Sequence, residues 1–246
     1  MGTKLVVQKR GHGSFAYKTP NHRFVSDAKY PELEKETVGE IMGFVQDPSK
    51  DVLLADVLLE SGKRIYILSA EGLERNQRIF IGKDAQIEKG SIVPLQSIPD
   101  GVQVFNVEHS PHDGGKLART SGTFATVSSH DDETGMVGIQ LPSKRTVSLK
   151  GACRATVGIA CGGGRTEKPF KKAGNRFRYM RARNKHWPIV RGTAMSAYDH
   201  PHGGRSMGKS SMISRHAPPG QKAGHIAASR VGRRRGKEDD ANEKNR

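Results

Sequence analysis

The stretch VLLADVLLESGKRIYILSA (residues 52–70) decides the fold of this chain. Its two runs rich in Val, Ile and Leu, residues 52–60 and 64–70, have the length and composition of β-strands. Between them, Ser61-Gly62-Lys63 is a turn signal, because glycine readily adopts the backbone conformations that hairpin turns need. The stretch therefore predicts a β-hairpin within a mainly β fold.

Similar short runs lie on both sides of this hairpin. They occupy residues 38–45, 77–81 and 91–95 in a first group, and 102–108, 123–130, 135–142, 145–149 and 153–160 in a second. The tetrapeptide Ile98-Pro99-Asp100-Gly101 marks a joint between the groups. Because regular short strands with turn signals are typical of small barrels, we predict two barrels, over residues 35–100 and 101–162.

The positive charge of the chain is concentrated in its C-terminal third. The whole chain has a net charge of +16, and residues 150–237 hold twenty-one Lys and Arg against two Asp and Glu. Residues 35–149 hold twelve Lys and Arg against sixteen Asp and Glu. Uncompensated cations at this density repel one another unless an anion neutralises them, so we expect a polyanionic partner.

A membrane is not the expected partner. The longest apolar stretch, residues 52–59, is interrupted by Asp56 and is far shorter than the ~20 residues that span a bilayer. The N-terminus lacks the apolar core of a signal peptide and the myristoylation pattern. The two cysteines, Cys153 and Cys161, lack the C-x-x-C spacing of zinc and redox sites, so we expect both to be reduced.

The segment after Gly162 is Gly-rich and basic, and its prolines allow a short helix only around residues 172–184. It cannot bury enough apolar surface to offset its ordering entropy, so we expect it to be ordered only against a partner. Arg and Lys neutralise phosphates and aromatic rings stack on unpaired bases, which favours folded RNA over duplex DNA. The aromatic residues of this segment include Phe170, Phe177, Tyr179 and Trp187. We predict RNA-binding extensions over residues 1–34 and 163–237, and a disordered acidic tail over 238–246.

Residues 203–210 fit G-x-x-x-x-G-K-[ST], the spacing of a phosphate-binding P-loop. That loop needs a buried strand before it and a helix after it, so that its amides point at the phosphates. Here Asp199 and Pro201 precede the match, and Pro218 and Pro219 follow it closely. A P-loop-type nucleotide hydrolase that uses residues 203–210 is therefore retained only as the alternative function.

His200 and His202 have the spacing of metal ligands or of an acid–base pair. A zinc site needs three or four ligands, and no Cys or acidic cluster completes one among the neighbouring cations. A Ser–His–Asp triad would require adjacent positions in a Pro- and Gly-rich loop to converge on one point. We interpret both histidines as RNA contacts, and expect no catalytic residue and no metal-ligating residue.

Four long motifs in the second half of the chain carry a resemblance. They are SPHDGGKLARTSGTFATV (110–127), CRATVGIACGGGRTEKPFKKAG (153–174), WPIVRGTAMSAYDHPHGG (187–204) and APPGQKAGHIAASRVGRRRG (217–236). Together with QKRGHGSFAYKTPNHR (8–23), they resemble the ribosomal protein L-two family of the large subunit, in its archaeal or eukaryotic-type form.

This resemblance implies an oligonucleotide-binding-type (OB-like) barrel followed by an SH3-like barrel, with basic N- and C-terminal arms that enter ribosomal RNA (rRNA). It implies a cytoplasmic, non-enzymatic constituent of the large subunit that binds rRNA near the peptidyl-transferase region and supports subunit association, tRNA placement and translation. The implied partners are large-subunit rRNA, neighbouring ribosomal proteins and the small subunit across the intersubunit face. No cofactor is expected, apart from Mg or K ions held through bound rRNA.

The motifs of the family indicate which residues face RNA. They are Lys116 and Arg119 in GGKLAR, Arg154 in CRAT, Arg165 and Lys168 in GGGRTEKP, Trp187 and Arg191 in WPIVRG, and His200 in the loop 199–204. The chain departs from the family around that loop, with Ser196-Ala197-Tyr198 where Asn-Pro-Val or Asn-Ala-Val is usual, and with Arg205 where a third glycine is frequent. The further RNA-binding candidates are Arg10, His22, Arg23, Lys172, Arg178, Arg183, Lys185, His202, Arg205, Lys209, Arg215, Lys222, Arg230, Arg233 and Arg234.

Overall fold

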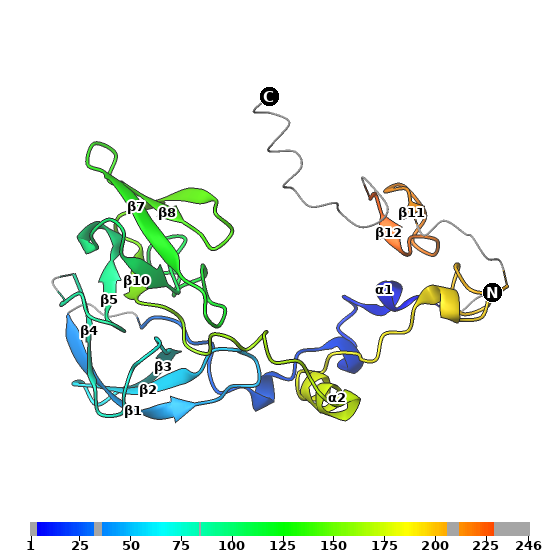
Figure 1. The fold of residues 1–246 in the computed structure, drawn as a ribbon, viewed down its shortest axis with the longest axis horizontal. Helices are drawn as coiled ribbons and strands as arrows, with labels where there is room; N and C mark the ends of the chain where they lie inside the picture. Colours follow the sequence, from blue (N-terminus) through cyan, green and yellow to red (C-terminus); the bar gives the residue numbers. More distant parts are fainter. Residues whose placement is uncertain (1–3, 32–35, 84, 206–211, 229–246) are drawn as a thin grey trace. The chain divides into compact units, whose positions relative to one another are not determined.

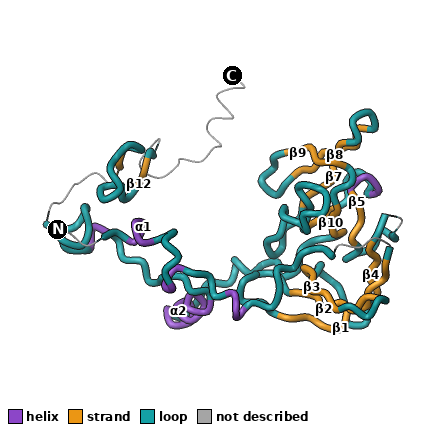
Figure 2. The backbone as a smooth tube through the Cα atoms, turned by 180° about the vertical axis from the view of Figure 1, so that it is seen from behind, coloured by secondary structure: helices purple, strands orange, loops and turns teal. Residues whose placement is uncertain are grey.

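The computed structural model describes residues 4–31, 36–83, 85–205 and 212–228. The chain divides into two compact units, which Figures 1 and 2 show as ribbon and tube. We call residues 20–176 the β unit, and residues 1–19 together with 177–246 the basic unit.

Ten strands of the β unit form one sheet in the order β3-β2-β1-β4-β5-β10-β6-β7-β8-β9. They are β1 (Thr37–Val45), β2 (Leu54–Leu59), β3 (Arg64–Leu68), β4 (Arg78–Ile81), β5 (Ile92–Pro94), β6 (Gln103–Phe105), β7 (Ala125–Asp131), β8 (Met136–Gln140), β9 (Thr146–Lys150) and β10 (Arg154–Val157). Each strand lies on a run that the sequence predicts, so the mainly β fold is confirmed. Within the described residues the order runs openly from β3 to β9, without a ladder that closes it into a barrel.

The hairpin of residues 52–70 forms as the sequence predicts. β2 and β3 pair antiparallel, with Leu54 opposite Leu68 and Leu58 opposite Arg64. Gly62 has φ of 79°, a left-handed value that glycine adopts without strain, and its N–H donates to Leu59 O at 2.8 Å. The turn therefore fixes the register that turns Val57 and Leu59 toward the core.

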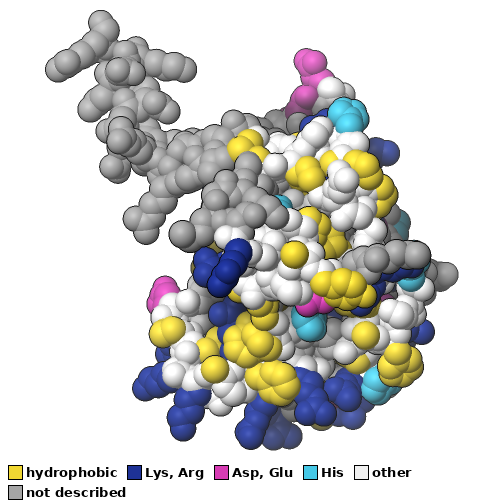
Figure 3. All heavy atoms as spheres, turned by 90° about the vertical axis from the view of Figure 1, so that its right-hand side faces the viewer, with side chains coloured by type: hydrophobic (Ala, Val, Ile, Leu, Met, Phe, Trp, Pro, Cys, Tyr) yellow, Lys and Arg dark blue, Asp and Glu magenta, His cyan; other side chains and the backbone are white. Residues whose placement is uncertain are grey.

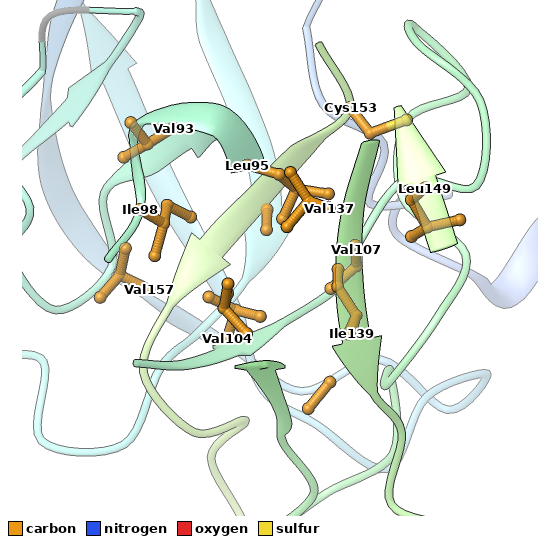
Figure 4. Close-up of a cluster of buried hydrophobic side chains, with 13 residues drawn as sticks. Val93, Leu95, Ile98, Val104, Val107, Val137, Ile139, Leu149, Cys153 and Val157 are labelled. Atoms are coloured by element: carbon orange, nitrogen blue, oxygen red, sulfur yellow. The ribbon is translucent and has the colours of Figure 1, made fainter. Parts of the chain in front are cut away.

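Three hydrophobic cores lie in the β unit, and β5 contributes to two of them. The first core contains Ile41, Val57 and Ile92, and the second contains Val93, Val104 and Ile139. Figure 4 shows side chains of the second core from β5, β6, β8 and β10 converging on one another. Neighbouring residues of a strand point to opposite faces, so Ile92 packs in the first core and Val93 packs in the second. The two cores therefore meet at β5. The barrel boundaries given above stay a prediction.

Short elements make up the rest of the described chain. They are α1 (Val6–Lys9), η1 (Phe15–Tyr17), η2 (Asn21–Arg23), η3 (Leu95–Ser97), α2 (Ala173–Ala182), η4 (Gly192–Ala194), β11 (Met212–Ile213) and β12 (His225–Ile226). The helix predicted around residues 172–184 is confirmed by α2. None of the helices in the described ranges is long and apolar enough to cross a membrane.

Candidate nucleic-acid interface

Almost all the charged side chains in the described part of the basic unit are cationic. Its described residues, 4–19, 177–205 and 212–228, carry twelve Lys and Arg and a single carboxylate side chain, Asp199. Figure 3 shows one face of the molecule, on which Lys and Arg side chains are far more abundant than Asp and Glu. This charge distribution is suited to a polyanion and to no cationic ligand.

Helix α2 has no buried residue. Arg178 and Arg181 are three residues apart and exposed, so they lie on one side of the helix. The guanidinium of Arg183 lies 4.1 Å from the ring centroid of Tyr179, and the large apolar side chain of Phe177 is 44% exposed. A ten-residue helix that buries none of its residues is only marginally stable by itself, and its Arg side chains are available to a partner.

Asn184 ends this helix and holds the N-terminal segment. Its φ is 50°, a left-handed value that Asn tolerates well, and Lys185 N–H donates to Met180 O at 2.9 Å across it. The side-chain amide of Asn184 donates to Phe15 O at 3.0 Å and to Lys18 O at 2.7 Å. Segments from the two ends of the sequence are thereby joined in the basic unit.

The loop of residues 195–204 is closed by its own hydrogen bonds. Ser196 O accepts from Asp199 N and His200 N, both at 3.2 Å, and Ser196 Oγ donates to Asp199 Oδ2 at 2.8 Å. Gly203 N donates to His200 O at 2.9 Å, and Gly204 N donates to Met195 O at 3.2 Å. Gly203 is required because an added Cβ would lie 2.0 Å from Ser196 O.

His200 is held as a neutral imidazole inside this loop. Its Nδ1 accepts from His202 N–H at 3.1 Å, so the proton of the neutral ring lies on Nε2. Burial, followed by the nearby His202, lowers the pKa of His200 from its ordinary value. The two rings meet edge to face with centroids 5.0 Å apart, and Gly192 leaves room for the His200 ring. The described part of the chain contains no group of three His, Cys, Asp or Glu side chains that could hold a metal ion.

The structure does not support a nucleotide cradle at residues 203–210. Two of the three described amides of the match, Gly203 N and Gly204 N, donate to carbonyls within the loop and not outward. The residues before them form turns, whereas a P-loop follows a buried strand. Residues 206–210, with Lys209, lie outside the described residues.

Two residues predicted to face RNA are bound within the β unit. Arg154 donates from Nη2 to Glu108 Oε1 and from Nη1 to Pro31 O, both at 2.8 Å, and its side chain is only 13% exposed. Arg119 donates to Gly115 O, Asp27 O and Ala28 O at 3.0 to 3.1 Å. Both guanidinium groups therefore fasten residues 27–31 to the sheet.

Two more predicted residues form ion pairs nearer the surface. Arg165 lies 3.0 Å from Asp51 Oδ2 and donates to Ser121 Oγ, whereas Lys116 lies 3.4 Å from Asp113 with its side chain 63% exposed. The other candidates in the described ranges are not in the β-unit core. Exposed ones are Arg10, His22, Arg23, Lys168, Lys172, Arg178, Lys185, Arg191, Arg205 and Arg215, and partly buried ones are Arg183, Trp187, His202 and Lys222. Lys209, Arg230, Arg233, Arg234 and the tail 238–246 lie outside the described residues.

Sequence reasoning missed the residues that hold residues 27–31, which we call the strap, in place on the sheet. Glu108 is fully buried and accepts from the N–H groups of Gly114 and Arg154 as well as from the Arg154 guanidinium. Tyr30 donates its hydroxyl to Asn106 O at 2.7 Å and lies 2.7 Å from Thr156 Oγ1. Burial raises the pKa of Tyr30 far above its ordinary value, so the phenol stays protonated. The sequence does mark Glu108 in one way: it is a single acidic residue at the end of the apolar run VQVFNVE (102–108), which is a pattern that can indicate a buried, paired carboxylate.

Comparison with known proteins agrees with this geometry. The family model for the C-terminal domain of Ribosomal Proteins L2 matches residues 88–223, which include β5 to β10, α2 and the His200 loop. The chain belongs to the ribosomal protein L2 family. The Large ribosomal subunit protein uL2 of Natronomonas pharaonis is 44% identical over 95% of this chain and 97% of that protein.

Other archaeal members of the ribosomal protein L2 family are equally similar. The uL2 of Methanothermobacter thermautotrophicus is 43% identical over 96% of this chain and all of its own length. That of Korarchaeum cryptofilum is 43% identical over 95% of this chain and 96% of its own length. The resemblance inferred from the motifs is therefore confirmed, and it extends to the part of the chain before residue 88.

Proposed function

We propose that this chain is a structural constituent of the large ribosomal subunit that binds large-subunit rRNA through its basic unit. The supporting observation is the combination of twelve cations against one carboxylate in the described part of that unit with a helix that buries nothing. Its relatives carry the name Large ribosomal subunit protein uL2. The proposed site is near the peptidyl-transferase region, where the chain supports subunit association and tRNA placement without a catalytic role.

In this proposal the β unit is the scaffold and the basic unit makes the rRNA contacts. The β unit supplies a scaffold that is held together by three apolar clusters and by the ion pair between Arg154 and the buried Glu108. The basic unit supplies exposed Arg and Lys, whose contacts with phosphates release condensed counterions. RNA suits it better than duplex DNA because it offers irregular pockets and unpaired bases to extended segments.

Binding of the full-length protein to large-subunit rRNA, measured by filter retention across a range of salt concentrations, tests this function. The logarithm of the association constant should fall steeply with the logarithm of salt concentration, by about 0.7 to 0.9 for each phosphate contacted. Duplex DNA of matched length serves as the competitor and should bind more weakly. A nearly flat salt response, or equal affinity for both nucleic acids, would contradict the proposal.

A second measurement places the protein in the cell. Sedimentation of ribosomal subunits from cells that express a tagged full-length chain should bring the chain down with large subunits at ordinary salt. A chain that stays at the top of the gradient while large subunits sediment normally would contradict a structural role in that subunit.

A further inference from the structure

A groove of about 340 Å³ lies within the basic unit, beside the His200 loop. One wall comes from the start of the chain, with Lys4, Leu5 and Gln8, and the other from residues 197–201 and Gly220. This volume is at the lower end of the range for small-molecule sites, so the groove has room for one small planar group rather than for an extended segment.

The apolar part of the groove can hold the faces of a ring. Leu5 is only 7% exposed and supplies an aliphatic surface, and Pro201 adds a second. Tyr198 also lines the groove, and 65% of its surface is exposed although it is a large aromatic residue. An exposed aromatic ring beside a cationic surface is the arrangement by which proteins stack unpaired nucleic-acid bases.

The polar part of the groove offers mainly hydrogen-bond donors. His200 Nδ1 accepts from His202 N–H, which leaves the Nε2 proton for a ligand. Gln8 Oε1 accepts from Leu5 N–H at 3.1 Å, which leaves the amide NH₂ as the donor end of that side chain. Lys4 adds an exposed ammonium group, which attracts a phosphate.

We propose that this groove takes one unpaired nucleotide of rRNA, with its base stacked on Tyr198 and its phosphate at Lys4. The inference rests on the proposed rRNA-binding function and adds to it a binding site for a single nucleotide, which we call the seat. Base acceptors would meet the Nε2–H of His200 and the amide of Gln8, while Asp199, which accepts from Ser196 Oγ at 2.8 Å, keeps the loop closed.

Substitutions in the full-length protein test the seat by filter binding to large-subunit rRNA, with all variants compared at the same series of salt concentrations. Tyr198→Ala should weaken binding about tenfold, the effect of losing one stacked base, whereas Tyr198→Phe should change it less than about twofold. Lys4→Gln should weaken binding and lower the salt slope by about one phosphate contact. Phe44→Ala is the control: Phe44 is an aromatic residue 39% exposed in the β unit and does not line the groove, so affinity should be kept.

Ultraviolet crosslinking gives a direct readout. Irradiation of the complex with rRNA, followed by digestion and mass spectrometry, should find a single nucleotide on the peptide that contains Tyr198. The double variant Lys4→Gln with Tyr198→Ala should lose less than the sum of the two single effects, because both residues hold the same nucleotide.

The outcomes of these experiments distinguish failure of the proposed seat from failure of the proposed rRNA-binding function. Wild-type affinity in Tyr198→Ala, with no crosslink at Tyr198, would overturn the seat while salt-dependent rRNA binding upheld the function. Absence of rRNA binding by the wild-type protein would overturn the function itself. Binding of free AMP or GMP as tight as that of rRNA would assign the groove to a free nucleotide and overturn the proposal.

Discussion

Arg154 and Glu108, 46 residues apart in the sequence, form an ion pair of 2.8 Å in which the carboxylate side chain is fully buried. The same guanidinium donates to Pro31 O, 123 residues away. One side chain at the start of β10 therefore joins the second half of the sheet to the strap that precedes β1.

Replacement of this arginine should destabilise the β unit strongly. Arg154→Met leaves the Glu108 carboxylate buried without its cation, and breaking a buried pair in this way costs about 3–5 kcal/mol of unfolding free energy. Chemical denaturation followed by circular dichroism measures the loss. Lys116→Met, which removes the exposed cation of the pair with Asp113, is the control and should change stability by less than about 1 kcal/mol. Equal effects of the two substitutions would contradict a structural role for Arg154.

His130 should make stability depend on pH. Its Nε2 donates to Leu95 O at 3.1 Å and its Nδ1 lies 2.7 Å from Asp100 Oδ1, so both ring nitrogens face acceptors. The Leu95 carbonyl, followed by the Asp100 carboxylate, raises the pKa of His130 above its ordinary value, against the opposing effect of burial. A raised pKa in the folded state means that the stabilisation is complete below about pH 6.5 and is lost as the pH rises through the raised value.

Denaturation of wild type and His130→Gln across this pH range checks the expectation. The difference in unfolding free energy should be largest at the acidic end and should shrink as the imidazole loses its proton. A difference that grows with rising pH would mean that the neutral ring is the stabilising form.

Gly192→Ala should displace the His200 ring, because the added Cβ would lie 2.2 Å from both Cε1 and Nδ1 of His200. Burial, the main cause of the lowered pKa of His200, would then be relieved, so His200 should titrate nearer its ordinary value. Nuclear magnetic resonance of the imidazole nitrogens reports both the tautomer and the titration. Gly174→Ala is the control, since nothing lies within 4 Å of its added Cβ, and it should leave the His200 signals unchanged.

Helix α2 should account for part of the salt dependence of rRNA binding. The double variant Arg178→Gln with Arg181→Gln should lower the slope of log K against log salt by about 1.5, as expected for two lost phosphate contacts. Lys144→Gln with Arg145→Gln removes two exposed cations from the turn between β8 and β9 and should leave the slope unchanged. A similar decrease in both variants would indicate a general charge effect and would contradict a specific contribution from α2.

The local parts of the fold were predictable from sequence, and the long-range contacts were not. Runs of Val, Ile and Leu with turn signals located all ten strands, since strand patterning is a property of neighbouring residues. The same patterning could not show that β10 pairs with both β5 and β6. The pattern within a strand does not specify which distant strand it pairs with. Nor could it place Ile92 and Val93 in different cores.

The candidate site was predictable in its charge but not in its geometry. The density of Arg and Lys identified the basic unit. The same reasoning, however, predicted RNA contacts both for Arg154, which is partly buried and paired with Glu108, and for Arg178, which is exposed. The groove beside His200 was missed because Lys4 and Tyr198 lie at opposite ends of the sequence. Exposure and long-range contacts decide between a structural and a binding arginine, and only the folded chain supplies them.

The central position of β10 has a consequence for the way the protein is made. This strand is the last of the ten in the sequence, yet it lies in the middle of the sheet and its Arg154 holds Pro31. Translation proceeds from the N-terminus, so β10 cannot join β5 to β6, and with them the two halves of the sheet, until residue 157 has been synthesised. Most of the cations of the chain follow that residue. The order of synthesis thus allows a nascent chain to complete its scaffold before it presents its polyanion-binding end.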